Sequence, residues 1–148
     1  MKARTRFLVF GVSVILFGEL AGNQALAADP LIGKWQNQLQ NPSTLTIQSI
    51  DATTGMVKGQ YHEGSTGADE PVIGWVNDAT PGTGDNVRVL SFTVRWAKFG
   101  SVTGWTGYLR NDPKTSTPTL YMQWNLARCN SQFDWDHIIA NQDRFTRI

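Results

Sequence analysis

The stretch that decides the fold is residues 87–110, VRVLSFTVRWAKFGSVTGWTGYLR. It holds two runs of β-branched and aromatic residues on either side of a short break, AKFG. Phe92 and Trp96 share one face of the first run, because alternate residues of a strand point to the same side. Thr103 and Trp105 share one face of the second run in the same way. This pattern predicts two consecutive strands joined by a short turn.

The remainder of the chain repeats this pattern. Short segments rich in Val, Ile, Thr, Trp, Tyr and Phe alternate with clusters of Gly, Asn, Asp, Pro and Ser, and no segment keeps a helical period. The pattern predicts eight strands and a short helical or irregular link between residues 130 and 135. The expected strands are residues 31–40, 43–50, 55–63, 71–77, 87–97, 103–110, 118–127 and 138–147.

The order of these segments predicts the fold class. Eight strands in succession, each linked by a short turn, are typical of an all-β fold, an eight-stranded antiparallel up-and-down β-barrel. Closure removes the exposed edges of an open sheet, and a barrel of this size has room inside for one small ligand.

The N-terminal segment is of a different kind. Basic residues within the first six positions precede an apolar run over residues 7–20, and the small-residue pattern ALA occupies residues 25–27. This arrangement predicts a secretory signal peptide over residues 1–27. The apolar run contains Glu19 and is too short to cross a bilayer, so we expect no membrane anchor. The mature protein is then a single domain, residues 28–148, secreted to the extracellular or periplasmic space.

Charge and motif content exclude several functions. The formal net charge is +1 at pH 7, and the basic residues are scattered, so we expect no nucleic acid partner. The two histidines, His62 and His137, form no metal-spaced cluster, and no nucleophile or phosphate-binding motif is present. We therefore expect no metal, no catalytic residue and no enzyme activity. The single cysteine, Cys129, is buried, free or paired between subunits, and a buried or merely tolerated thiol is favoured.

The six tryptophans suggest what the barrel holds. Strand parity places Trp35 on the same face as Asn37, and Trp105 on the same face as Ser101 and Thr103. If these faces point inward, the interior combines flat apolar walls with neutral polar groups. An unpaired polar group inside a protein costs about 1–3 kcal/mol, and a bound polar ligand would supply its partner.

Six motifs, in this order, resemble the avidin and streptavidin family. The resemblance covers nearly all of the mature chain, and six motifs at compatible spacing are far more specific than any one alone. The motifs are GKWQNQL at 33–39, GQY at 59–61, FTVRW at 92–96, TGWTG at 103–107, QWNL at 123–126 and DRFT at 143–146. The resemblance implies a protein that binds biotin non-covalently and with high affinity in a Trp-lined barrel pocket, with no cofactor.

The resemblance also implies a role for each polar residue. Asn37, Ser43 and Tyr61 would donate hydrogen bonds to the ureido oxygen of biotin, which stabilises its polarised form. Asp143 would accept from one ureido N–H. Thr103 would lie near the thiophane sulfur. Ser101 would lie near the valerate carboxylate, and the apolar walls would come from Leu39, Trp96, Trp105, Trp124 and Leu126.

Two assignments are less direct, because the sequence departs from the family pattern. The link after Leu39 is longer than usual, which leaves Ser43 or Asn41 as the matching donor, and Ser43 is preferred. The position of the acceptor for the second ureido N–H is occupied by Glu63. Either this carboxylate or Ser65 accepts the second N–H, and Ser65 is favoured.

Two tryptophans have other expected roles. Trp35 is expected to plug one end of the barrel. Trp135 matches a family tryptophan that reaches into the binding site of a neighbouring subunit, which implies a homo-oligomer, with a tetramer favoured over a dimer. Packing of Trp135 on its own barrel is the alternative. A lipocalin-like carrier of another small hydrophobic ligand is the alternative function, and sequestration of biotin outside the cell is a hypothesis for the biological role.

Overall fold

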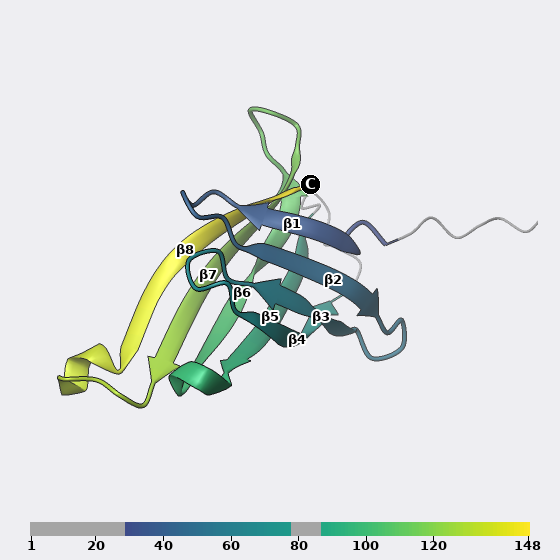
Figure 1. Cartoon of the computed structure of the whole chain (residues 1–148). Helices are drawn as coiled ribbons and strands as arrows, with labels where there is room; N and C mark the ends of the chain where they lie inside the picture. The colour runs from purple at the N-terminus through teal and green to yellow at the C-terminus, as the bar shows by residue number, and fades with distance from the viewer. Residues whose placement is uncertain (1–28, 78–86) are drawn as a thin grey trace, which may run out of the picture.

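The computed structural model describes residues 29–77 and 87–148, so the expected signal peptide lies outside the described residues. Within this part of the chain, eight antiparallel strands form a closed barrel in sequence order (Figure 1). This confirms the predicted fold class. The strands are β1 (Gly33–Asn37), β2 (Thr44–Ile50), β3 (Met56–His62), β4 (Asp69–Asn77), β5 (Arg88–Trp96), β6 (Ser101–Asn111), β7 (Pro118–Arg128) and β8 (Ile138–Arg147).

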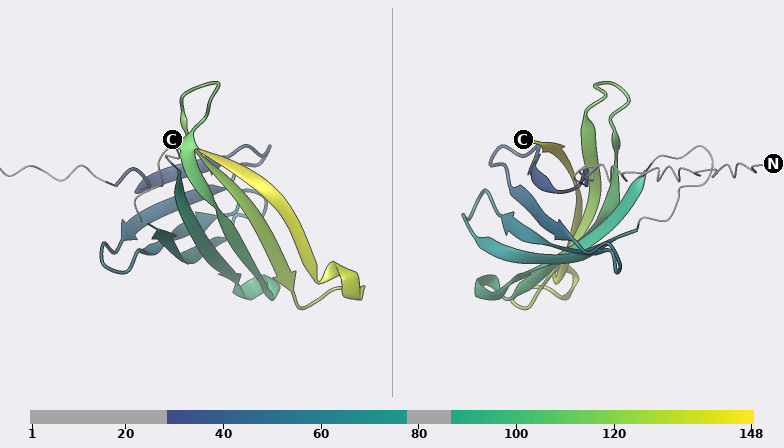
Figure 2. Two further views of the ribbon diagram at one scale, coloured as in Figure 1. Left: turned by 180° about the vertical axis from the view of Figure 1, so that it is seen from behind. Right: turned by 90° about the vertical axis from the view of Figure 1, so that its right-hand side faces the viewer.

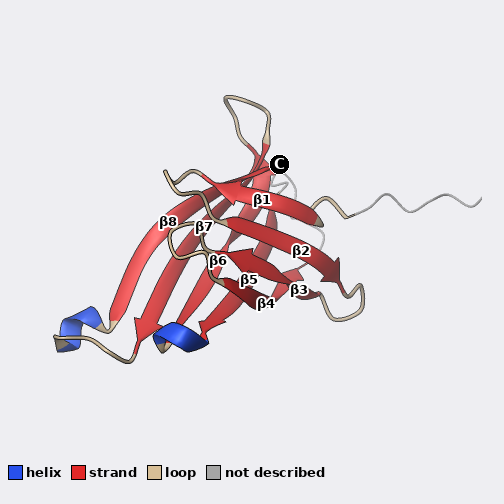
Figure 3. Cartoon of the chain, viewed as in Figure 1, coloured by secondary structure: helices blue, strands red, loops and turns tan. Residues whose placement is uncertain are grey.

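Two short 3-10 helices complete the described structure. η1 (Ala97–Phe99) joins β5 to β6, and η2 (Asp134–Asp136) lies in the link where a short helical or irregular segment was expected. Both lie at the same end of the barrel (Figures 2 and 3). Gly100 follows η1 with a φ of 60°, a conformation that glycine adopts at little cost.

Strand parity decides which side chains fill the barrel. In β5, alternate residues from Leu90 to Trp96 are buried, and the residues between them face outward. β2 and β6 show the same alternation, so the inward faces predicted for Ser43, Thr103 and Trp105 are confirmed. The two strands of the deciding stretch pair directly, with Phe92 opposite Trp105.

The first strand is shorter than predicted. We expected a strand over residues 31–40, but β1 ends at Asn37. The Asn37 side-chain oxygen accepts a hydrogen bond from the Ser43 backbone N–H at 2.8 Å, which closes the link between β1 and β2. Pro42 within this link has no N–H to give to a strand ladder. The backbone ladder between β1 and β2 therefore ends at Asn37, where the Asn37 side chain, and not a backbone carbonyl, accepts the Ser43 N–H.

The barrel closes where β8 pairs with β1. The closing ladder is short, and its partners are Trp35 with Arg147, Gln36 with Thr146 and Asn37 with Phe145. The ladder between β6 and β7 is much longer and runs from Ser101 to Asn111.

Trp35 fills one end of the barrel, as expected. Its side chain is fully buried, and its indole N–H donates to the Leu31 carbonyl at 2.9 Å. The Arg147 guanidinium lies 5.8 Å from the ring centroid and donates to the Pro30 and Ile32 carbonyls. The N-terminal link and the C-terminal strand thus hold the tryptophan from outside. Among residues 29–77 and 87–148, the cavity lies at the opposite end of the barrel.

Of the alternatives for Cys129, the buried thiol is wrong. Cys129 follows the last residue of β7, and its thiol is free and exposed. A free, merely tolerated thiol fits this position, and pairing between subunits stays a prediction. Among residues 29–77 and 87–148, no helix is long and apolar enough to cross a membrane.

Replacing Gly107 with alanine is expected to lower the free energy of unfolding by about 1–3 kcal/mol. A Cβ at this position would lie 2.0 Å from the Tyr121 carbonyl oxygen and 2.7 Å from the Met122 sulfur. Gly104, on the same strand, is the matched control, because a Cβ there would come no closer than 4.0 Å to Thr93. Urea denaturation of both variants measures the difference, and equal stabilities would contradict the argument.

Candidate functional site

A cavity of about 520 Å³ occupies the open end of the barrel. This volume is in the range of small-molecule sites. Every ligand residue that the sequence predicted on the chain's own barrel lines it: Asn37, Leu39, Ser43, Tyr61, Ser65, Trp96, Ser101, Thr103, Trp105, Trp124, Leu126 and Asp143. The other lining residues are Glu63, Thr66, Phe99, Arg128, Asn130 and Ile139.

Aromatic rings form the walls and hold one another in place. The Trp105 ring stacks on Phe92 with centroids 4.9 Å apart, and it lies 5.0 Å from the Tyr61 ring. Trp96 meets Tyr61 edge-on at 5.8 Å, and its indole N–H donates to the Thr103 hydroxyl at 2.8 Å. Because each ring is packed against another, the cavity has its shape before any ligand arrives.

Asn37 presents a buried donor to this cavity. The side chain is 5% exposed, and its oxygen is used by the Ser43 backbone N–H. Its Nδ2 makes no hydrogen bond of ordinary geometry with any described residue. This donor helps to lower the pKa of Asp143, but the two side chains form no hydrogen bond of ordinary geometry. An unpaired buried donor costs about 1–3 kcal/mol, and an acceptor atom of a ligand in the cavity would remove this cost. Asn41, the alternative to Ser43 in the sequence, is exposed and does not line the cavity.

Two hydroxyl groups, those of Ser43 and Tyr61, line the same cavity as Asn37. Burial raises the pKa of Tyr61 well above its ordinary value, and the nearby Ser43 hydroxyl opposes this rise only in part. The phenol therefore stays protonated at neutral pH and can donate. The Ser43 hydroxyl oxygen accepts from the Gly64 backbone N–H at 3.1 Å, which leaves the hydroxyl proton free to point elsewhere.

Asp143 supplies an acceptor. It lies on β8, is 5% exposed and accepts from the Trp105 indole N–H at 3.4 Å. Burial raises the pKa of this carboxyl group, while the nearby Trp105, Trp124 and Asn37 side chains lower it by a smaller amount. A carboxylate has room for several donors, so a long bond to one indole leaves it able to accept from a ligand N–H. The cavity thus combines convergent donors with a buried acceptor.

Comparison with known proteins identifies the family. The family model described as Avidin family matches residues 26–148, which is most of the chain. The chain belongs to the avidin family. No curated protein sequence matches it.

Solved structures of this family share the barrel. The chain is similar to Xenavidin, with 26% identity and a TM-score of 0.65 over 80% of this chain and 97% of that chain. It is similar to a biotin binding protein from chicken, with 28% identity and a TM-score of 0.65 over the same shares, 80% and 97%. It is also similar to shwanavidin in a biotin complex, with 29% identity and a TM-score of 0.59 over 82% of this chain and 100% of that chain.

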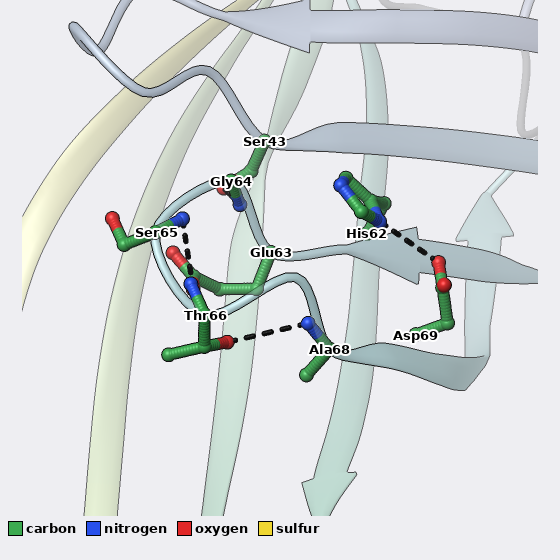
Figure 4. A network of polar contacts seen from close by, with 8 residues as sticks. All are labelled: Ser43, His62, Glu63, Gly64, Ser65, Thr66, Ala68 and Asp69. Atoms are coloured by element: carbon green, nitrogen blue, oxygen red, sulfur yellow. Dashed lines mark hydrogen bonds and ion pairs between the residues drawn. The ribbon is translucent and has the colours of Figure 1, made fainter.

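In this avidin-family barrel, the loop from β3 to β4 is held by its own acidic residue. The Glu63 carboxylate accepts from the backbone N–H groups of Ser65 at 3.1 Å and Thr66 at 2.6 Å (Figure 4). Burial opposes ionisation of Glu63, but these hydrogen bonds outweigh it and lower its pKa. The Thr66 hydroxyl accepts from the Ala68 N–H at 3.3 Å, and Gly64 ties the loop to Ser43. The loop therefore has a fixed shape beside the cavity.

Replacing Glu63 with alanine is expected to speed amide hydrogen exchange at Ser65 and Thr66 by roughly 10- to 100-fold, because charge-assisted bonds to both amides are lost. Asp51→Ala is the matched control. Asp51 accepts from Thr53 and Thr54 in the β2–β3 turn, away from the cavity.

Exchange measured by NMR separates the two variants. Asp51→Ala should speed exchange in its own turn and leave the β3–β4 loop unchanged. Unchanged exchange at Ser65 and Thr66 in the Glu63 variant would show that the Glu63 carboxylate does not hold the β3–β4 loop in place.

Trp135 lies apart from the chain's own cavity. It belongs to η2, is 78% exposed and stacks on Phe133 with centroids 5.7 Å apart. The alternative that Trp135 packs on its own barrel does not fit this exposure. Arg128 anchors η2 by donating to the Asp136 carbonyl at 3.0 Å and by pairing with the Asp136 carboxylate.

Some lining residues were not predicted from the sequence. Arg128 lies on β7 at the same parity as Trp124 and Leu126, so the alternation that placed those two residues in the site could have found it. Phe99 lies on η1, where the sequence predicted only a short turn between two strands. Among the described residues, no group of three or more His, Cys, Asp and Glu side chains could hold a metal ion.

Proposed function

We propose that this chain binds biotin non-covalently and with high affinity in the barrel cavity. The observation that carries the proposal is the buried, unpaired Asn37 Nδ2, which lies in a site that also offers the hydroxyl groups of Ser43 and Tyr61. The ureido group of biotin has one strong acceptor oxygen and two N–H donors, which match these donors and the Asp143 acceptor. Membership of the avidin family supports the assignment.

Each part of the site has a defined role in this proposal. Asn37, Ser43 and Tyr61 donate to the ureido oxygen, and fixed donors of this kind stabilise negative charge without rearrangement. Asp143 accepts from one ureido N–H. Ser65 accepts from the other, because the Glu63 carboxylate already accepts two backbone N–H groups of its own loop.

The remaining contacts are with the rest of the ligand. Thr103 lies near the thiophane sulfur and Ser101 near the valerate carboxylate. The rings of the bicycle and the acyl chain pack against the apolar wall residues, which are Leu39, Trp96, Trp105, Trp124 and Leu126.

Isothermal titration of the protein with biotin tests the proposal. The protein is first denatured and refolded to remove any bound ligand, and tryptophan fluorescence is followed in parallel. We expect one biotin per chain and a change in emission, because tryptophans line the cavity. Absence of binding by the folded protein would overturn the proposal. A long-chain fatty acid is the comparison ligand, and its preferential binding would favour the lipocalin-like alternative.

We propose that the protein acts as a binding protein and not as an enzyme. Binding is the function shared within the avidin family. Biotin released from the complex by denaturation should be chemically unchanged by mass spectrometry. A modified product would contradict this assignment.

We propose that the protein is a homo-oligomer, with a tetramer favoured, in which Trp135 covers the cavity of a neighbouring subunit. The exposure of this large apolar side chain supports the proposal, since burial against a second copy would remove it from water. Light scattering after size-exclusion chromatography gives the subunit number. Trp135→Ala should weaken biotin binding, and a monomer with full affinity would contradict the proposal.

We propose that residues 1–27 are removed and that the mature chain, residues 28–148, is secreted and sequesters biotin outside the producing cell. The basic, apolar and small-residue order of the leader supports this proposal. Mass spectrometry of the protein in the culture medium should give a mature N-terminus near residue 28. A supernatant without biotin-binding capacity would contradict the sequestering role.

A further inference from the structure

Arg128 is the last residue of β7 and lines the cavity. It pairs with Ser101 across the β6–β7 ladder, so it lies at the same level of the barrel as the start of β6. About a third of its side chain is exposed, whereas Asp143 is almost fully buried. Arg128 therefore lies toward the mouth of the cavity, and Asp143 lies deeper.

The acidic and basic side chains that line the cavity lie on different parts of its wall. Among the described lining residues, Glu63 and Asp143 are acidic and Arg128 is the only cation. Glu63 belongs to the β3–β4 loop, while Arg128 lies at the end of β7 beside Asn130. An anionic group at the mouth is repelled by Glu63 and attracted by Arg128. Arg128 also pairs with the Asp136 carboxylate, which offsets part of its charge, so it acts on an anion at the mouth mainly as a hydrogen-bond donor.

The guanidinium group of Arg128 is held in a fixed orientation. Its Nε donates to the Asp136 carbonyl at 3.0 Å, and its Nη2 pairs with the Asp136 carboxylate. This hydrogen bond is the main reason that the pKa of Asp136 is lowered. Neither contact uses Nη1, and within the described residues Nη1 has no hydrogen-bond partner. A planar guanidinium fixed in this way can still donate to a second carboxylate.

We propose that Arg128 is a specificity-determining residue that favours biotin with a free carboxylate over biotin whose carboxylate has become an amide or an ester. The inference rests on the proposed function. With the ureido ring bound by Asn37 and Asp143, the valerate chain runs toward the mouth. Its carboxylate then meets Arg128, Ser101 and Asn130, where a charge-assisted hydrogen bond forms that a neutral amide or ester cannot replace.

Titration of the full chain with biotin, biotinamide and biotin methyl ester tests the inference. We expect wild-type protein to bind biotin roughly 5- to 30-fold more tightly than either neutral ligand, since the arginine is partly exposed. In Arg128→Gln this ratio should approach one, while Arg128→Lys should keep part of it. A ratio of affinities is the chosen readout because general damage to η2 or the barrel weakens all three ligands alike.

Arg110→Gln is the matched control. Arg110 lies over the rings of Tyr108 and Tyr121 and does not line the cavity, so this variant should keep the wild-type ratio. If Arg128→Gln does not fold, the wild-type ratio is measured at increasing ionic strength, where it should decrease because salt screens the interaction.

The outcomes separate the inference from the function on which it rests. A wild-type ratio near one, or an unchanged ratio in Arg128→Gln, overturns the inference and leaves biotin binding intact. A ratio that does not respond to salt also counts against it. A folded wild-type protein that binds none of the three ligands overturns the proposed function itself.

Discussion

Replacing Asp143 with alanine is expected to weaken biotin binding by roughly 30-fold to several thousand-fold, which corresponds to about 2–5 kcal/mol. The carboxylate is 5% exposed and lies in the same cavity as the donors of Asn37 and Tyr61. Without Asp143, a ureido N–H would be left in a water-poor cavity with no acceptor at this position. Competitive titration measures the loss, and wild-type affinity in this variant would show that Asp143 does not contact the ligand.

The Asp143→Asn variant shows how much of the binding depends on the negative charge of Asp143 and how much on its hydrogen-bond acceptor oxygen. Asparagine keeps a carbonyl oxygen at nearly the same place, so the affinity should fall less than in the alanine variant. The ionised carboxylate is the stronger acceptor, so wild-type affinity should also decrease as the pH falls through the raised pKa of Asp143. An affinity that does not change over this range would contradict an ionised acceptor.

Asp143→Asn should weaken biotin binding but increase the stability of the ligand-free protein. Burial raises the pKa of Asp143 above 3.8, so the folded chain binds this proton more tightly than the unfolded chain. The stabilising contribution is fully present below pH 3.8 and is lost as the pH rises through the folded-state pKa. Near neutral pH, ligand-free Asp143→Asn should therefore be more stable than wild type, and the difference should shrink toward acid. Urea denaturation across this pH range measures it.

Replacing Trp35 with alanine is expected to lower the free energy of unfolding by about 3–5 kcal/mol. The side chain is fully buried at the closed end of the barrel, and its loss leaves a large cavity and an unpaired Leu31 carbonyl. Trp35→Phe should cost less, because the ring still fills most of the space and only the N–H is lost.

Trp75→Ala is the matched control for the plug. Trp75 lies on β4 with 53% of its side chain exposed, so its removal should cost about 1 kcal/mol or less. Denaturation is followed by circular dichroism, because both variants change the fluorescence. Equal losses of unfolding free energy in the Trp35 and Trp75 variants would mean that burial of Trp35 at the closed end does not stabilise the barrel.

Alternation explains why the fold could be predicted from the sequence. The deciding stretch forms β5 and β6, whose inward residues include Phe92 and Trp105, and a strand buried on one face must place alternate residues inside. The end of β1 could not be predicted in this way. It depends on the Asn37 side chain closing onto Ser43, a contact between residues six positions apart that no periodic pattern contains.

The site residues that lie on strands could be predicted from the sequence. Asn37, Thr103 and Asp143 lie on inward faces, and motif resemblance supplied their expected roles. Arg128 shares that parity, but it is charged, and the predicted interior combined tryptophans with neutral polar groups only. The acceptor position of Glu63 could not be decided, because its contacts are with the backbone of its own loop. A role for Trp135 in another subunit stays a prediction, since it depends on a second chain.

The short ladder between β1 and β8 has a mechanical consequence. These strands hold the two ends of the described barrel together, so tension applied at the chain ends loads this seam before the longer ladder of β6 and β7. Asn37 and Asp143 lie on opposite sides of the seam. A ligand held by both residues joins the two edges from inside, and the force needed to open the barrel becomes a measure of whether the cavity is occupied.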